Sequence, residues 1–310
     1  MAAPSSVARS FDMKVSALIR SSVVVAITTL LLQAPAFAAS SVWKISKGND
    51  ELYLGGTIHM LPPSAFPLPA EFEQAYQKAD VVVLEAKLPD PADQQATMAM
   101  IAKLSYSNGD TLTQKLSPKV RQSLTDYLKT FNLTPQQFNA FKPGFVAMQI
   151  AMLELQKAGM AGEGVDAYFV KKATTDAKTQ QYLETVEFQL DLMAAMGAGT
   201  EDQFMLANLK RADETAELLR QSIAAWQVGD IQALERILLN DARADDPASF
   251  ALLFTQRNQD WIPKIQQLFG NGQRELILVG AGHLPGKDGV LALLSTAGYQ
   301  VEHFTAVQPK

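Results

Sequence analysis

Residues 275–286 read ELILVGAGHLPG, and this stretch decides the fold. Residues 275–279 form a short apolar run, which predicts a buried strand, and Gly280-Ala281-Gly282 predicts a tight turn directly after it. A helix is expected over residues 289–297 and a last strand over residues 299–304. Strand, glycine turn, helix and strand together make a βαβ-like unit, which is typical of α/β folds.

The N-terminal part of the chain supplies the other strands of the predicted sheet. Residues 42–46 and 52–56 read as a hairpin that turns at residues 47–50. Residues 81–84, with the sequence VVVL, are apolar and β-branched, which is typical of a strand buried on both faces of a sheet. Residues 180–183 predict a further strand. We therefore predict an α/β (α+β) fold, with a central mixed sheet from the N- and C-terminal parts and a large helical insertion between them.

Composition and length set limits on the function. A single domain is expected over residues 39–310, with the helical insertion at about residues 90–270. Helix starts with proline in the first turn occur at Ser117-Pro118, Thr134-Pro135 and Pro143. The formal net charge of −5 argues against a nucleic-acid partner. The chain has no cysteine, which excludes disulfides, thiol nucleophiles and cysteine-ligated zinc.

The first 38 residues are predicted to be a signal peptide. Basic residues precede an apolar run at residues 21–32, and Ala36-Phe37-Ala38 has the small-x-small pattern that signal peptidase recognises. Cleavage after Ala38 would leave a periplasmic or secreted protein with no stable membrane span. The alternative is an uncleaved anchor, for which the apolar run is short.

Candidate functional residues gather where the predicted strands end. Four ionisable residues lie at or shortly after strand ends: His59, Glu85, Glu184 and His283. Both histidines close matching tetrads, GTIH at residues 56–59 and GAGH at residues 280–283. Ligands of open α/β sheets bind beyond the carboxyl ends of the strands, so these side chains are expected to converge. Two imidazoles and two carboxylates could form a metal site or an acid/base constellation. The alternatives are loop or helix-entry histidines and solvated or capping glutamates.

Several short motifs resemble those of the TraB/GumN family, in the same order along nearly the whole chain after the signal segment. They comprise Val42-Trp43-Lys44, Leu54 to His59, Ala79-Asp80, Val83-Leu84-Glu85, Gly164-Val165-Asp166, Leu183-Glu184-Thr185 with Gln189, Arg257-Asn258, Val279 to Gly286, and Gly298-Tyr299.

This resemblance implies a function that the motifs alone do not. The related Tiki proteins resemble metal-dependent proteases that use manganese or cobalt and two Gly-x-x-His motifs, and erythromycin-esterase-like enzymes share the broader superfamily. By resemblance, His59 and His283 are metal-ligand or catalytic positions, Glu85 is the acid after the second motif strand, and Glu184 and Arg257-Asn258 are supporting positions.

These positions suggest one mechanism. His59, Glu184 and His283 would hold a divalent cation, and Glu85 would act as general base on a bound water. The family resemblance implies manganese or cobalt rather than zinc as that cation. Arg257, beside Asn258, would bind a substrate carboxylate or the developing oxyanion. The sequence does not decide which glutamate is the ligand and which is the base.

A second hypothesis is a protein without turnover. The same constellation could hold a metal or another ligand in a binding protein, or serve an accessory factor for polysaccharide export in the cell envelope. In the hydrolase hypothesis the partner is a peptide or small-molecule substrate. The sequence identifies neither that substrate nor the oligomeric state.

Overall fold

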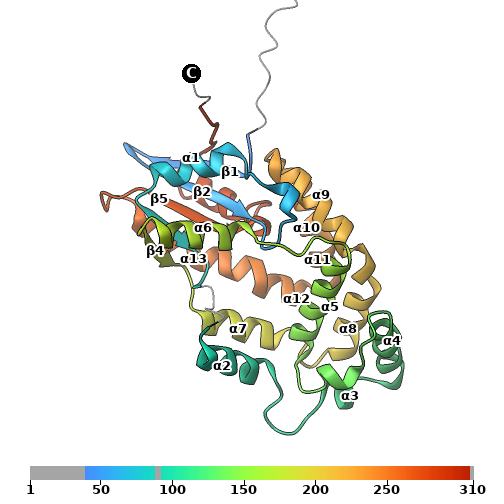
Figure 1. Cartoon of the computed structure of the whole chain (residues 1–310). Helices are drawn as coiled ribbons and strands as arrows, with labels where there is room; N and C mark the ends of the chain where they lie inside the picture. The colour runs from blue at the N-terminus through green and yellow to red at the C-terminus, as the bar shows by residue number, and fades with distance from the viewer. Residues whose placement is uncertain (1–38, 88–91, 308–310) are drawn as a thin grey trace, which may run out of the picture. The chain divides into compact units, whose positions relative to one another are not determined.

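The predicted strands form one six-stranded mixed sheet (Figure 1) in the order β4-β3-β5-β2-β1-β6. The computed structural model describes residues 39–87 and 92–307, so the predicted signal peptide and its cleavage site lie outside the described residues. The strands are β1 (Val42–Lys47), β2 (Asp50–Thr57), β3 (Val81–Leu84), β4 (Thr179–Tyr182), β5 (Glu275–Gly280) and β6 (Gln300–His303).

Four neighbouring strands of this sheet run in the same direction. Strand β5 pairs in parallel with both β2 and β3, and β3 pairs in parallel with β4. The register places Thr57 opposite Gly280, and Leu84 opposite both Leu278 and Tyr182. The carboxyl ends of β4, β3, β5 and β2 therefore lie along one edge of the sheet, in that order.

The predicted hairpin and the C-terminal unit complete the sheet. Strand β1 pairs antiparallel with β2 through the turn at residues 47–50, and β6 pairs antiparallel with β1. Strands β5 and β6 consequently run in the same direction, but β2 and β1 lie between them. The βαβ-like unit predicted from residues 275–304 thus crosses over two strands instead of joining neighbours.

Helices separate all the consecutive strands except β1 and β2, which confirms the predicted α/β class. The α-helices are α1 (Ala70–Lys78), α2 (Gln94–Leu104), α3 (Leu112–Lys115), α4 (Pro118–Lys129), α5 (Pro143–Lys157), α6 (Val165–Thr175), α7 (Val186–Ala195), α8 (Glu201–Lys210), α9 (Thr215–Gln227), α10 (Ile231–Leu238), α11 (Asn240–Asp245), α12 (Pro247–Phe250), α13 (Gln256–Leu268) and α14 (Val290–Thr296). A π-helical segment, Ala251–Thr255, joins α12 to α13. The predicted helix start at Thr134-Pro135 produces only a short 3-10 turn, Pro135–Phe138.

The sheet is buried on both faces, as its apolar strands predict. Residues alternate along a strand, so in β3 Val82 and Leu84 join the core on one face and Val81 and Val83 join the core on the other. Helices α1, α6 and α9 cover the first face and α13 and α14 cover the second. Helices between β3 and β4 pack with helices that follow β4 around a third core, which includes Leu124, Val146 and Phe204.

No helix within residues 39–87 and 92–307 is long and apolar enough to cross a membrane.

The helical part of the chain is interrupted by β4, which joins the sheet as its edge strand. Because β4 lies beside β3, the chain brings Glu184 back to the sheet edge that carries the other candidate residues.

Candidate functional site

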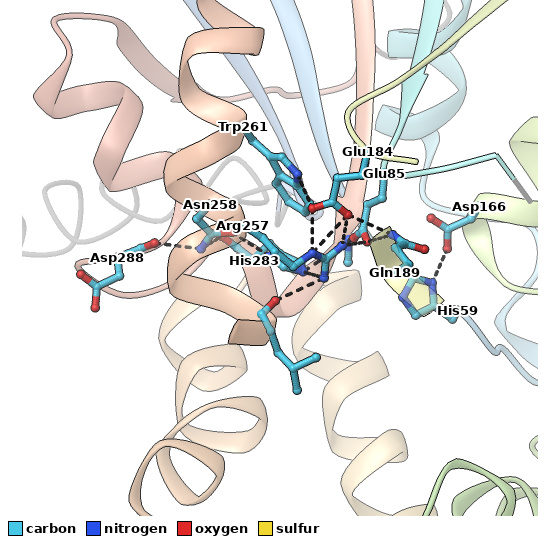
Figure 2. Close-up of polar contacts among 12 residues, drawn as sticks. His59, Glu85, Asp166, Glu184, Gln189, Arg257, Asn258, Trp261, His283 and Asp288 are labelled. Carbon is cyan, nitrogen blue, oxygen red and sulfur yellow. Dashed lines mark hydrogen bonds and ion pairs between the residues drawn. The ribbon is translucent and has the colours of Figure 1, made fainter. Parts of the chain in front are cut away.

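The carboxyl edge of the sheet brings all the predicted site residues together (Figure 2). In the order of the strands, Glu184 follows β4, Glu85 follows β3, His283 follows β5 and His59 follows β2. Arg257, from the start of α13, inserts its guanidinium among them. The side chains come from segments far apart in the sequence, and the parallel register of the four strands aligns them.

His59 is oriented by an aspartate that had no role in the sequence-based hypothesis. Its Nδ1 donates to Oδ2 of Asp166 at 2.8 Å, which leaves Nε2 directed toward the site. The Asp166 carboxylate raises the pKa of His59 to about 9. The imidazole is 69% exposed whereas Asp166 is 10% exposed, so solvent screens part of this attraction.

The segment that carries Asp166 packs directly on the His59 loop. The amide of Val165 donates to the carbonyl of Ile58 at 3.0 Å. A Cβ at Gly164 would lie 2.1 Å from the carbonyl oxygen of His59, so only glycine permits this approach. The short Gly164-Val165-Asp166 sequence therefore fixes both the backbone and the ring of His59.

His283 is held in one tautomer by Asn258. The Asn258 amide donates through Nδ2 to the Asp288 carbonyl at 2.8 Å, so its Oδ1, 2.7 Å from His283 Nδ1, must accept the ring proton. The ring is packed between Phe254 and Trp261, and burial lowers the pKa of His283 to about 3. His283 is therefore neutral, with a lone pair on Nε2.

Both imidazoles and one carboxylate meet over Gly280. An atom placed at the Cβ position of this glycine would lie 3.3 Å from Glu85 Oε1, 3.5 Å from Cδ2 of His283 and 3.6 Å from Nε2 of His59. The amide of Gly280 donates to Glu85 Oε1 at 2.6 Å. Glycine at this position keeps the space between the three side chains open.

Arg257 uses every guanidinium N–H on protein acceptors. Its Nε and Nη2 donate to the Glu184 carboxylate at 2.9 and 2.8 Å, and Nη2 also donates to Glu85 Oε2 at 2.6 Å. Its Nη1 donates to the Leu253 carbonyl at 3.2 Å and lies 3.1 Å from Nε2 of His283. As arranged, Arg257 organises the two glutamates and has no N–H left for a substrate.

The two glutamates differ in their surroundings. Glu184 accepts further hydrogen bonds from Trp261 Nε1 at 2.8 Å and Gln189 Nε2 at 3.2 Å, so its carboxylate is fully committed to protein donors. Burial of Glu85 opposes its charged form, but His283, Arg257 and His59 outweigh burial and lower the pKa of Glu85 to about 2. Glu85 is thus a stable anion and a weak base, and it keeps Oε1 on the side of the histidines.

The site opens into a pocket of about 540 Å³. Its polar end contains His59, Glu85, Arg257 and His283, together with Thr57 from the end of β2. Its other walls come from apolar side chains of α5, α9, α10 and the π-helical segment. This volume lies in the range that small-molecule sites occupy.

The predicted ligand set fits a divalent metal only in part. Among the described residues no group of three or more His, Asp or Glu side chains is arranged to hold a metal ion. Glu184 does not fit as a ligand because Arg257, Trp261 and Gln189 use its oxygens. The chemistry of His59, Glu85 and His283 does fit, because the second ring nitrogen of each histidine is held by another side chain, as in protein metal sites. Arg257 Nη1 would have to leave Nε2 of His283 for that set to bind.

Asp166, Gln189 and Trp261 contact the predicted residues but had no role assigned from the sequence. Asp166 and Gln189 belong to motifs that carried the family resemblance, which was the available signal for them. Trp261 lies one helical turn after Arg257 on α13, and the spacing of four residues places both on one face. This helical spacing is the signal in the sequence that associates Trp261 with the site.

Comparisons with known proteins agree with the motif-based resemblance. The model of the TraB/PrgY/gumN family matches residues 41–303, which include every residue of the site described above. No curated protein and no solved structure matches the chain. Because the match extends over nearly the whole chain, the resemblance predicted from the sequence is confirmed, and the chain belongs to the TraB/PrgY/gumN family.

Proposed function

We propose that this protein is a hydrolase of esters or amides that depends on a divalent metal, with its reacting groups at the carboxyl edge of the sheet. The observation that carries the proposal is the convergence of His59 Nε2, Glu85 Oε1 and the His283 ring over Gly280. Imidazole nitrogen and carboxylate oxygen suit manganese, cobalt and zinc, and the resemblance favours the first two. Export by the N-terminal segment remains part of the proposal.

Our assignment of the glutamates follows from their hydrogen bonds. His59, Glu85 and His283 would hold the metal, and Glu184 would hold Arg257. The low pKa of Glu85, about 2, suits an anionic ligand better than a general base. A bound divalent metal supplies polarisation of a carbonyl group and activation of a water.

The remaining residues act by positioning. Asp166 holds the His59 ring with Nε2 toward the pocket, and Asn258 fixes the tautomer of His283. Arg257 keeps Glu85 ionised and oriented. The apolar side chains of the other pocket walls would contact the apolar part of a bound substrate.

The test is a metal titration of wild type, His59→Ala and His283→Ala, with His303→Ala as the matched control because the third histidine lies on β6, away from the pocket. Thermal unfolding is followed with manganese, cobalt and zinc in turn. A metal should stabilise wild type and His303→Ala but neither of the other variants. Equal stabilisation of all four proteins would remove the metal site.

Hydrolysis is tested separately, on the metal-loaded wild type with peptide and ester substrates. Turnover that is lost in both His59→Ala and His283→Ala supports the hydrolase. Tight metal binding without turnover of any substrate would instead favour the binding or envelope-accessory hypothesis.

A further inference from the structure

A second pocket continues the site pocket away from the sheet. It has a volume of about 340 Å³ and shares four lining residues with the site pocket: Thr215, Leu218, Leu253 and Phe254. Leu253 and Phe254 belong to the π-helical segment, directly before the helix that carries Arg257. The second pocket is therefore a continuation of the site pocket beyond its polar end.

Beyond its polar end, the walls of the site pocket are mainly aliphatic. They include Leu155, Leu218, Leu219, Leu238 and Leu253. Ser222, a polar residue among them, donates its hydroxyl to the carbonyl of its own helix at Leu218.

The second pocket combines apolar side chains, among them Ala147, Ile150 and Phe204, with polar side chains, among them Gln203 and Asn208. Its cation, Arg211, already pairs with Asp241 and Asp245.

Such walls discriminate between ligand classes. A peptide would bring backbone N–H and C=O groups into this space, and each group left without a partner there is costly. A linear alkyl chain brings no polar group and gains free energy from every methylene that leaves water. The aliphatic walls of the site pocket therefore favour an alkyl chain over a polypeptide.

A buried hydroxyl lies at the polar end of the site pocket. Thr57 is 2% exposed and lines the site pocket, and its Oγ1 has no hydrogen-bond partner among the described residues. A buried hydroxyl without a partner calls for one, and a ligand carbonyl can accept its proton. The polar group of a ligand would then lie at the sheet edge and its apolar part beyond it.

We propose that the site takes an ester or amide with a linear acyl chain. The carbonyl lies at the polar end, beside Thr57 and His59, and the chain runs past Leu253 into the second pocket. Hydrolysis breaks the bond between the acyl carbon and its oxygen or nitrogen, and water adds OH to the acyl carbon and H to the leaving group. The hydrolytic step rests on the proposed function, whereas recognition of the acyl chain does not.

Binding is tested with methyl ketones from butanone to dodecan-2-one, which keep the carbonyl and lack a leaving group. Isothermal titration calorimetry should show affinity rising about four-fold for each added methylene until the pockets are full. Leu253→Trp fills the junction between the pockets and should end this rise at a shorter chain. Leu252→Trp is the matched control, because Leu252 is the neighbouring residue, is 37% exposed and lines neither pocket.

Circular dichroism checks that both variants are folded. If Leu253→Trp does not fold, the ketone series with the wild type still tests the proposal. Affinity that does not depend on chain length in the wild type overturns the proposal. So does an unchanged chain-length dependence in folded Leu253→Trp.

A series of p-nitrophenyl esters of increasing acyl length separates the two proposals. Graded ketone binding without ester hydrolysis would keep the acyl site and remove the hydrolase. Hydrolysis at the same kcat/KM for every acyl length would keep the hydrolase and overturn the acyl site.

Discussion

Replacing Arg257 by methionine should destabilise the fold strongly. The guanidinium is 8% exposed, and its partners Glu85 and Glu184 are 11% and 4% exposed. Methionine preserves most of the packing volume but leaves two buried carboxylates without their cation. Removing one partner of a buried ion pair typically costs about 3–5 kcal/mol, because the remaining charge stays buried without compensation.

Urea unfolding at neutral pH, followed by circular dichroism, measures this cost. The matched control is Arg220→Met, which removes an ion pair to Glu217 whose side chains are 54% and 58% exposed. Exposed pairs contribute about 0–1 kcal/mol, so the control should unfold near the wild-type urea concentration. A loss in Arg257→Met no larger than that of the control would refute the reasoning.

A double variant tests the mechanism of the loss. In Arg257→Met/Glu184→Gln one of the two unpaired charges is gone, while the glutamine can still accept from Trp261. We expect the double variant to be more stable than Arg257→Met alone. If Glu184→Gln instead adds its full cost to that of Arg257→Met, the two side chains are not coupled.

Three further predictions concern pH and the His59 loop. Because the pKa of Glu85 is lowered to about 2, the ionised carboxylate stabilises the folded protein. This contribution is complete above the ordinary glutamate pKa and is lost as the pH falls through about 2. Acid unfolding of wild type and of Glu85→Gln measures the loss. Asp166 raises the pKa of His59 to about 9, and His59 must lose its proton to bind a metal. The metal affinity measured by calorimetry should therefore rise with pH up to about 9. Affinity that levels off near pH 6 would contradict this role of Asp166. Gly164→Ala should lower stability by about 1–3 kcal/mol and abolish metal binding, because its Cβ would displace the His59 backbone; unchanged melting and binding would contradict the contact.

Much of the fold was predictable because its strands are short apolar runs with clear ends. The VVVL run at residues 81–84 matches β3 residue for residue, and the run at 275–279 matches β5 to within one residue. The Thr134-Pro135 start failed as a helix because capping residues mark where a helix can begin, whereas packing decides how far it continues. The crossover from β5 to β6 depends on the pairing of β1 with β6, which sequence periodicity does not encode.

The site was predictable in membership but not in the pairing of its residues. His59, Glu85, Glu184 and His283 each follow a strand, and the rule that ligands bind at the carboxyl ends of parallel strands was sufficient to gather them. The position of Arg257 between the two glutamates depends on the π-helical turn before α13, where the Leu253 carbonyl accepts from the guanidinium. Because single π-helical turns are rare, the ordinary helical spacing of the sequence does not predict this contact.

The strand order itself explains why the two glutamates cannot share one role. Glu184 follows β4, the edge strand, and is separated from His283 by the whole width of β3, whereas Glu85 follows β3 and is the direct neighbour of the histidine. A carboxylate at the edge position can reach Arg257 but not the space over Gly280. If β4 were absent, Arg257 would lose the acceptor of its Nε–H, and its charge would be shared only with Glu85. The edge strand therefore supplies the carboxylate that accepts from Nε and Nη2 of Arg257, and the Gly280 amide holds Oε1 of Glu85 on the side of the two histidines, where our proposal needs it.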